Sequence, residues 1–271
     1  LANTLGFAIE HEYSVEDYTL AFCNYHDGSS NIRFFEHYHP FQFFEFPRPK
    51  FHLSNRIKWK LKDRLHNAID HVENFDPTFD LQKLDPQKSV ELKGFHFSSG
   101  ELAFKHRSQI CDILRFSKSE VVPIDPLIKK AKKRYDILLG VHIRQNDYRS
   151  FYDGKFYISP DQYLRSVEEF KTLDLPSQKI GVMICSDDMD TIQEIQRKHL
   201  DYLYPRGTIA QDMYALSKCD YTIGPKATTM STWASYFGES LHLQIDRNTD
   251  SIKLNNFKKV ERLEPFSPFL D

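Results

Sequence analysis

Residues 136–152, DILLGVHIRQNDYRSFY, join a short apolar run to an abrupt cluster of ionisable side chains. The apolar run predicts a buried strand, and His142, Arg144 and Asp147 then come at its carboxyl end, where open parallel sheets bind their ligands. His142 and Arg144 are two residues apart, so they are expected on the same face of the strand. The planar guanidinium of Arg144 suits a phosphate or carboxylate, and the stretch therefore predicts a site for a small anionic ligand.

Further apolar runs follow on the C-terminal side of this stretch and alternate with amphipathic segments of helical length. We predict strands at 136–143, 179–185, 219–223 and 240–245. One predicted helix begins at Ser159-Pro160-Asp161, with Ser159 as its cap. Three further helices are predicted at 189–199, 211–218 and 228–237. This alternation predicts a doubly wound parallel sheet with right-handed crossovers.

The first 117 residues are less regular, because aromatic residues and prolines cluster at 34–51. Such a run can stack on sugar rings, but packing in a core or loop is the favoured interpretation. We predict strands at 18–23 and 90–97 and helices at 56–75 and 99–114, which together indicate an N-terminal α/β half.

The stretch 117–135, with Pro123, Pro126 and the basic run KKAKKR, is the predicted linker, and the basic run is predicted to be a solvated helix face. The predicted domains are therefore 1–117 and 118–271.

The composition is that of a globular protein. Of 271 residues, 40% are hydrophobic and 27% charged, and no apolar run is long enough to span a bilayer. The net charge of -2 gives no bulk attraction for nucleic acid, so no nucleic-acid partner is expected. The four cysteines lie far apart without a C-x-x-C pair, and we expect them to be reduced. A cytoplasmic location without a transmembrane segment fits these features best.

The chain opens with LANTLGFAIEHEYSV, whose apolar positions Leu1, Leu5, Ala8 and Ile9 have helical spacing. This pattern suggests that the sequence starts inside a helix and that something upstream of it is missing.

Two more polar clusters follow predicted strands. Ser186-Asp187-Asp188 could bind a metal, a nucleobase or a ribose, or could cap the next helix. A metal site is disfavoured, because no Asp-x-Asp stands at the strand end, although Asp188-Met-Asp190 has that spacing. The third cluster runs from Gly224 to Trp233, where Thr228, Thr229 and Ser231 meet the start of a helix. Free N–H groups and hydroxyls there suit a pyrophosphate, and simple N-capping is the alternative.

Taken together, these motifs resemble a known family. HIRQNDY is similar to the H-x-R-R-x-D-Y motif of the α-1,2-fucosyltransferases and their α-1,6- and protein O-fucosyltransferase relatives. SDD resembles their second motif, and GPKATTMSTWASYFG, preceded by the helix opening at Asp212, resembles a third. Residues 94–116 also resemble the strand and helix that end the family's N-terminal half.

The resemblance implies a GT-B-like fold of two Rossmann-like domains and an inverting, metal-independent transfer of fucose from GDP-fucose, with no cofactor. The nucleotide sugar would bind mainly to the C-terminal domain, and a glycan would be the acceptor, with α-1,2 transfer to galactose as the expected linkage. Arg144 would contact the β-phosphate, whereas His142 and Asp188 would contact the guanosine side. Phosphate would also be held by the hydroxyl residues of the third cluster, Thr228, Thr229 and Ser231.

The base that accepts the acceptor's proton is expected to be Asp147, with Asp153 as a weaker alternative. The competing role for Asp147 is to orient Arg144 or to cap the following loop. Peripheral membrane association is compatible with the sequence.

The chain departs from the family pattern at Gln145, where the motif has a second Arg, and at Asn146, where Gly is common. The resemblance also implies that the given sequence lacks the family's first strand and the Gly-Asn-rich loop that precede a helix similar to LANTLGFAIEH. The lost cation should weaken donor binding unless Lys226 or Arg149 replaces it. Another nucleotide sugar, or a catalytically silent glycan- or nucleotide-binding protein, is therefore an open alternative. An unrelated doubly wound enzyme is less favoured, since no P-loop or G-x-G-x-x-G follows a predicted strand.

Overall fold

The computed structural model of the protein describes residues 2–11, 69–74, 79–85, 89–94, 97–116, 118–226 and 228–263. The chain divides into two compact units. The N-terminal unit comprises Leu1–Arg115 with Arg262–Asp271, and the C-terminal unit comprises Phe116–Glu261. The predicted strand 18–23 and the aromatic run 34–51 lie outside the described residues.

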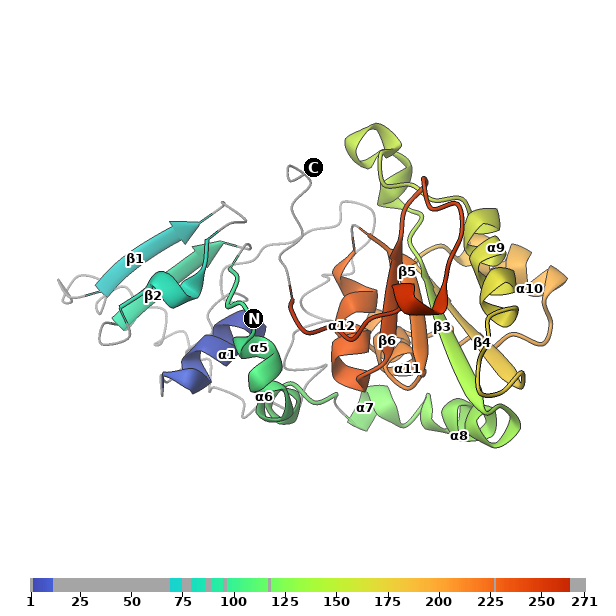
Figure 1. The fold of residues 1–271 in the computed structure, drawn as a ribbon, viewed down its shortest axis with the longest axis horizontal. Helices are drawn as coiled ribbons and strands as arrows, with labels where there is room; N and C mark the ends of the chain where they lie inside the picture. Colours follow the sequence, from blue (N-terminus) through green and yellow to red (C-terminus); the bar gives the residue numbers. More distant parts are fainter. Residues whose placement is uncertain are drawn as a thin grey trace. The chain divides into compact units, whose positions relative to one another are not determined.

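The C-terminal unit is built on a four-stranded parallel sheet (Figure 1). Its strands are β3 (Ile137–Ile143), β4 (Ile180–Ser186), β5 (Tyr221–Pro225) and β6 (Leu241–Ile245). They lie in the order β4-β3-β5-β6, and each neighbouring pair is parallel. All four predicted strands of this half are confirmed, within one or two residues at each end.

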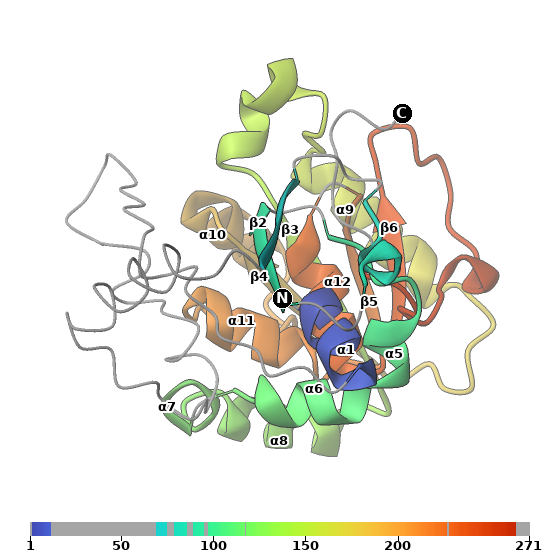
Figure 2. The same cartoon turned by 90° about the vertical axis from the view of Figure 1, so that its left-hand side faces the viewer.

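Helices cover both faces of this sheet (Figures 1 and 2). One face carries α9 (Pro160–Lys171) and α10 (Met189–Lys198), and the other carries α8 (Asp125–Arg134), α11 (Ile209–Leu216) and α12 (Thr229–Gly238). Within β3, Leu139 and Val141 pack with α9 and α10, whereas Leu138 packs with α8 and α11. Burial on both faces explains why this strand is apolar throughout.

Side-chain caps mark where several helices of this unit begin. Ser159 accepts a hydrogen bond from the Gln162 N–H at the start of α9, as predicted. The helix predicted at 211–218 starts earlier, at Ile209, because Thr208 and Gln211 form a reciprocal capping box.

The direction of the chain across the sheet reverses between β3 and β5. From β3 the chain crosses through α9 to β4, and it then returns through α11 to β5, on the other side of β3. The helices that follow β3 and β5, namely α9 and α12, therefore lie on opposite faces of the sheet. Doubly wound sheets bind ligands outside the carboxyl ends of the two strands at such a switch point. His142 is on β3 and Gly224 is on β5, so two of the predicted clusters meet there.

The described part of the N-terminal unit contains a two-stranded parallel sheet and the α-helices α1, α5 and α6. The strands are β1 (Ile69–Asn74) and β2 (Ser89–Gly94), and the helices are α1 (Ala2–Glu10), α5 (Leu102–Lys105) and α6 (Arg107–Ile113). The predicted opening helix is confirmed, and Leu5 and Ala8 are buried in it. Gly6 lets α1 approach α5 closely, since a Cβ there would lie 2.7 Å from the Ala103 nitrogen. The predicted strand 90–97 is β2, and the predicted helix 99–114 is broken at His106 into α5 and α6.

The sequence-based helix at 56–75 is wrong for its last turns. Residues 69–74 form β1, which pairs in parallel with β2 from Ile69–Ser89 to Asn74–Gly94. Apolar residues at helical spacing also fit a strand when the run is short and a partner strand is available, so pairing decided the outcome. The remainder of the predicted helix, 56–68 and 75, lies outside the described residues.

The predicted linker is also wrong, because 118–134 is mostly helical. It forms α7 (Lys118–Val121) and α8, and Ile128 and Ala131 of α8 are buried against the sheet. Pro126, taken as a sign of a linker, occupies the first turn of α8, where proline is well tolerated. The basic run is an exposed face of this helix, as predicted. Within the described ranges, no helix combines the length and apolar character needed to cross a membrane.

Candidate functional site

Arg144 follows β3 and lies between two carboxylates. Its Nε is 2.9 Å from Asp147 Oδ1, and its Nη1 is 3.2 Å from Asp187 Oδ2. The guanidinium also lies over the Tyr148 ring, 5.7 Å from the centroid. Burial disfavours its charge, but the hydrogen bond to Asp147 and the charge of Asp187 outweigh burial and raise the pKa of Arg144. The side chain is 33% exposed, so it is a fixed cation that an anionic ligand can reach.

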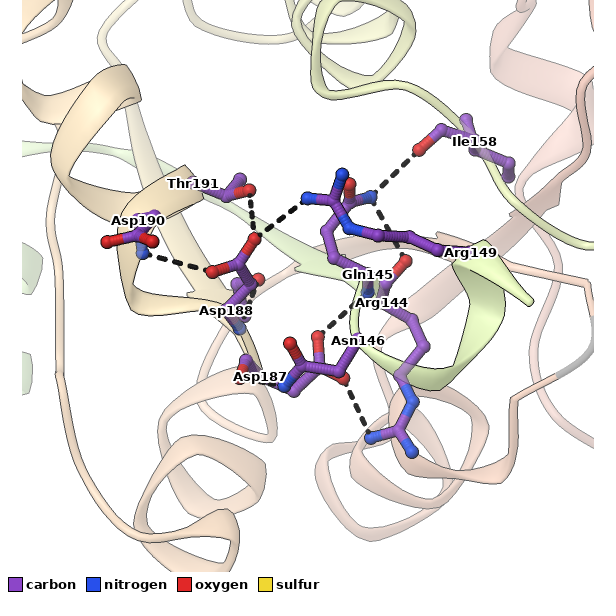
Figure 3. A network of polar contacts seen from close by, with 10 residues as sticks. Arg144, Gln145, Asn146, Arg149, Ile158, Asp187, Asp188, Asp190 and Thr191 are labelled. Atoms are coloured by element: carbon purple, nitrogen blue, oxygen red, sulfur yellow. Dashed lines mark hydrogen bonds and ion pairs between the residues drawn. The ribbon is translucent and has the colours of Figure 1, made fainter. Parts of the chain in front are cut away.

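Asp187 is the first residue after β4, and it contacts both the side chain and the backbone of the neighbouring segment (Figure 3). Its Oδ1 accepts a hydrogen bond from the Gln145 N–H at 2.8 Å, and its carbonyl accepts one from Asn146 Nδ2 at 2.5 Å. Burial raises the pKa of Asp187, although the Gln145 N–H and the charge of Arg144 oppose the shift.

Gln145 stands where the fucosyltransferase motif has its second arginine, and its side chain is fully buried. Its Nε2 donates to the Ile158 carbonyl at 2.9 Å and to the Arg144 carbonyl at 3.1 Å. The residue therefore fastens the loop after β3 and adds no charge to the site. Of the two expected substitutes, Lys226 is exposed and Arg149 pairs with Asp188 at 3.1 Å. Figure 3 shows the guanidinium groups of Arg149 and Arg144 apart, each on its own carboxylate.

Asp188 caps α10. One of its oxygens accepts a hydrogen bond from the Asp190 N–H at 3.0 Å, and the other accepts one from the Thr191 hydroxyl at 2.8 Å. Although burial works in the other direction, these bonds and the one from Arg149 lower the pKa of Asp188. The helix-capping role predicted as the alternative for Asp188 is therefore observed in the structure, and its contact with the donor stays a prediction.

The start of α12 brings the third cluster to the carboxyl end of β5. Thr228 caps the helix by accepting from the Met230 N–H, and Thr229 is the first helical residue. Ser231 is fully buried, and within the described part of the chain its hydroxyl has no hydrogen-bond partner. This hydroxyl lies against Gly224 so closely that a Cβ at Gly224 would overlap it.

His142 lies on β3 with its ring on the side covered by α11 and α12. It is 2% exposed, and its Nδ1 has no partner among the described residues. Burial, and secondarily the charge of Arg144, lowers the pKa of His142 to about 3, so the imidazole is neutral at physiological pH. His242 on β6 is also buried, and burial lowers its pKa to about 4. Both histidines are therefore uncharged at neutral pH. His142 Nδ1 can offer a neutral hydrogen-bonding atom, whereas His242 Nδ1 already bonds to the Thr222 hydroxyl at 2.8 Å.

Asp212 of α11 is a buried carboxyl that the motif search did not assign to the site. It is 7% exposed and accepts a hydrogen bond from the Gly207 N–H at 3.2 Å. Burial raises the pKa of Asp212 to about 7, so this acid is close to half-protonated at neutral pH. The backbone carbonyl oxygen of Asp212 lies 3.8 Å from Cys185 Sγ. Cys185 is on β4, directly opposite His142 on the neighbouring strand β3.

The structure thus separates the predicted residues by environment. Arg144 and Asp147 lie at the partly exposed end of β3, while His142 and Ser231 are buried beneath the helices. Sequence reasoning missed Asp187, Asp212 and His242. Asp187 was visible in the Ser-Asp-Asp cluster, but spacing alone does not tell which of two consecutive acids reaches Arg144. Within the described ranges, no three His, Cys, Asp or Glu side chains are grouped so that they could hold a metal ion.

The reversal of strand order, the cation of Arg144 after β3 and the helix start with the unpartnered Ser231 hydroxyl are features of α/β proteins that bind nucleotides or phosphates. Residues 95–261 match the model of glycosyl transferase family 11, and the chain belongs to this family. The resemblance drawn from the motifs is thereby confirmed at family level.

The solved structures similar to this chain include fucosyltransferases. A mutant of Arabidopsis thaliana FUT1 in complex with GDP is 11% identical, with a TM-score of 0.54, and the match covers 98% of this chain and 70% of that one. Fucosyltransferase NodZ from Bradyrhizobium is 16% identical, with a TM-score of 0.43, over 61% of this chain and 59% of that one. NodZ alpha-1,6-fucosyltransferase co-crystallized with GDP is 15% identical, with a TM-score of 0.45, over 73% and 65%.

In these two NodZ matches this chain therefore spans less than two thirds of the solved structure. No curated protein matches the chain. The parallel sheet and the likeness to FUT1 confirm the predicted GT-B-like α/β fold class.

Proposed function

We propose that the protein is an inverting, metal-independent glycosyltransferase that moves fucose from GDP-fucose to a hydroxyl of a glycan, with α-1,2 transfer to galactose as the expected linkage. Membership of glycosyl transferase family 11 and the similarity in fold to a FUT1 mutant described with GDP support this proposal. The observation that carries it is the switch point between β3 and β5, where Arg144 stands beside the strand that leads into α12.

The donor's diphosphate would lie between Arg144 and the start of α12. The guanidinium offers charge and directed N–H groups, and the first turn of α12 offers backbone N–H groups and the hydroxyls of Thr228 and Thr229. The unpartnered atoms His142 Nδ1 and Ser231 Oγ lie on the same side of the sheet. Buried polar atoms without partners are uncommon in native proteins, so ligand contact is a physical explanation for them.

The proposed reaction is a single displacement at the anomeric carbon of fucose. The acceptor oxygen forms a bond to this carbon as the bond to the β-phosphate oxygen breaks, and GDP leaves with the electron pair. Negative charge then grows on the diphosphate, and Arg144 would stabilise it. Attack from the face opposite to GDP inverts the anomeric centre. The proton of the acceptor hydroxyl passes to a base.

Asp147 is the base we propose, because it is 53% exposed and follows Arg144 by three residues. Its ion pair with Arg144 fits the alternative of an orienting role equally well, so the variant Asp147→Asn is informative. Loss of transfer with intact donor binding would support the base, and parallel loss of both would make Asp147 structural. Asp153 is the weaker candidate, and it lies in the same loop with a left-handed backbone.

The direct test is calorimetric titration of the protein with GDP-fucose, GDP and UDP-galactose in the presence of EDTA, with Arg144→Ala as a parallel sample. We expect both GDP compounds to bind the wild type and to bind the variant far more weakly. Transfer is then measured with a galactose-terminated acceptor. Binding of UDP-galactose alone, or binding that needs a divalent metal, would overturn the proposal.

A second candidate is a family member that uses another nucleotide sugar. The observation in its favour is Gln145, which places a buried neutral side chain where the motif has a cation. Competition between GDP-fucose, GDP-mannose and UDP-sugars in the same titration distinguishes the two candidates.

A further inference from the structure

Arg144 contacts two carboxylates of very different character. Asp147 lies on the same loop and is 53% exposed, so water and salt screen its ion pair. Asp187 comes from the end of a different strand, β4, and is 17% exposed. An exposed pair contributes little to holding a flexible arginine in one place, whereas a shielded partner anchored to a strand contributes more.

The contacts of Asp187 also divide between its two oxygens. Oδ1 accepts the Gln145 N–H at 2.8 Å, and Oδ2 faces Arg144 Nη1 at 3.2 Å. The hydrogen bond fixes the carboxylate relative to the backbone after β3, which leaves Oδ2 at a set position for the guanidinium. Figure 3 shows this carboxylate close to the backbone of Gln145 and joined to the guanidinium of Arg144.

We propose that Asp187 is the positioning residue for Arg144, and that its negative charge directs the guanidinium towards the donor diphosphate. The inference rests on the proposed function and adds to it a residue that the family motif alone did not assign. A positioning role of this kind is expected to act through Arg144, because an aligned bidentate cation binds phosphate better than a mobile one. Asp187 itself would not touch the donor.

The competing explanation is that Asp187 only fastens the backbone of the loop. The variant Asp187→Asn separates the two roles, because the amide oxygen can still accept the Gln145 N–H while the charge is lost. GDP binding is measured by calorimetry for the wild type, Asp187→Asn, Arg144→Ala and the double variant. The expected result is about tenfold weaker GDP binding for Asp187→Asn, and no further weakening by this change when Arg144 is already alanine.

Two matched variants serve as controls for the same Asp-to-Asn change. Asp190→Asn alters an exposed carboxylate in the first turn of α10 for which the described residues show no arginine contact, and it should leave GDP affinity unchanged. Asp147→Asn alters the exposed partner of Arg144, and GDP binding should weaken less than in Asp187→Asn. Melting temperatures of all variants show whether each still folds.

The outcomes distinguish this inference from the proposed function. A wild type that does not bind GDP would overturn both. Wild-type affinity in Asp187→Asn, or an equal weakening whether or not Arg144 is present, would overturn the positioning role and leave the proposed function standing.

The pH dependence of GDP-fucose binding gives a second measurement. The charged and titratable groups around Asp187 are Arg144 and Asp147 on the loop after β3, Tyr148 on the same loop and Tyr163 on α9. GDP-fucose is the suitable probe, because its doubly esterified diphosphate does not titrate as the pH is lowered. Burial raises the pKa of Asp187 above its ordinary value, so the affinity of the wild type should fall at acidic pH as Asp187 is protonated and no longer directs Arg144. Asp187→Asn should lack this fall, and profiles of the same shape in both proteins would overturn the proposal.

Discussion

The two sides of the predicted donor site differ in how they handle polar groups. At the carboxyl ends of β3 and β4, Arg144 and Arg149 each pair with an aspartate, and all of these contacts are partly open to water. Between the sheet and helices α11 and α12, by contrast, His142 and Ser231 are buried and uncharged, and His142 Nδ1 and Ser231 Oγ have no hydrogen-bond partner among the described residues. In the first region, which we call the charged edge, both guanidinium groups therefore already have carboxylate partners. In the second region, the neutral layer, His142 Nδ1 and Ser231 Oγ have no partner among the described residues.

The difference teaches how a dianionic ligand can be held without a cluster of cations. One guanidinium supplies the charge, and hydroxyls and N–H groups supply directed dipoles that remain in place when charge develops. In the described part of the chain, the position of the motif's second arginine contributes to structure and not to charge, because the Gln145 side chain binds the Ile158 carbonyl. A donor would thus gain its affinity from both regions, and each region is open to a separate test.

The largest effect should come from the charged edge. Arg144→Ala is expected to lower fucosyl transfer by about 10²–10³-fold, equivalent to about 3–4 kcal/mol of transition-state stabilisation, with the fold retained. Arg144→Lys keeps a positive charge but loses the planar fork, and we expect it to recover only part of the activity. Steady-state transfer rates and GDP titrations check both variants. Normal turnover by Arg144→Ala would remove the charged edge from the mechanism.

The next effect concerns Asp212, a buried acid of α11, which is one of the helices that cover the neutral layer. Burial raises its pKa from the ordinary value of 3.8 to about 7, so the folded chain keeps a proton that the unfolded chain releases above pH 4. The stability linked to this proton is full at low pH and is lost as the pH rises to 7. Asp212→Asn avoids that loss, because the amide is never charged.

We therefore expect the advantage of Asp212→Asn in unfolding free energy to grow by roughly 2–3 kcal/mol between pH 5 and pH 8. Urea unfolding at the two pH values measures it. Asp174→Asn, the same change at an exposed position, should show no such growth. An advantage independent of pH would mean that Asp212 is ionised in the folded protein.

A third effect tests the close packing of β5 against α12. In Gly224→Ala the added methyl would overlap Ser231, and relief requires the first turn of α12 to shift. Overpacking of this kind typically costs about 1–3 kcal/mol, and the same shift should weaken GDP binding. Thermal unfolding and calorimetry of the variant measure the two effects. An unchanged melting temperature with unchanged affinity would show that the helix start tolerates movement.

Much of the charged edge and of the sheet could be predicted from the sequence. The apolar runs of β3 to β6 are continuous because both faces of the sheet are covered, and polar residues begin where each of β3, β4 and β5 ends. Arg144 could be found because it directly follows such a run. The starts of α9 and α12 could also be predicted, because Ser159 and Thr228 are residue types that commonly cap helices and each directly precedes its helix in the sequence.

The rest depended on contacts between distant residues. β1 became a strand through its pairing with β2, and α8 became part of the core through Ile128. The role of Gln145 depends on Ile158, and that of Asp187 on Arg144, 43 residues away, so neither is visible in local spacing. Burial of Asp212 is likewise a property of the packed helix layer. Ser231 lies between these cases, because its place near a helix start was predicted but its missing partner was not.

Ser231 gives the smallest and most specific effect. Replacing it with Ala removes a buried hydroxyl that has no partner among the described residues, so the melting temperature should stay equal or rise slightly. If the neutral layer receives the donor, the same change should weaken GDP binding by about fivefold, or roughly 1 kcal/mol. Thr232→Ala on the same helix is the matched control for loss of a hydroxyl, because the Thr232 hydroxyl already bonds within the protein. A stable Ser231→Ala protein with wild-type GDP affinity would mean that the donor is held by the charged edge alone, and the division of labour between the two regions would be rejected.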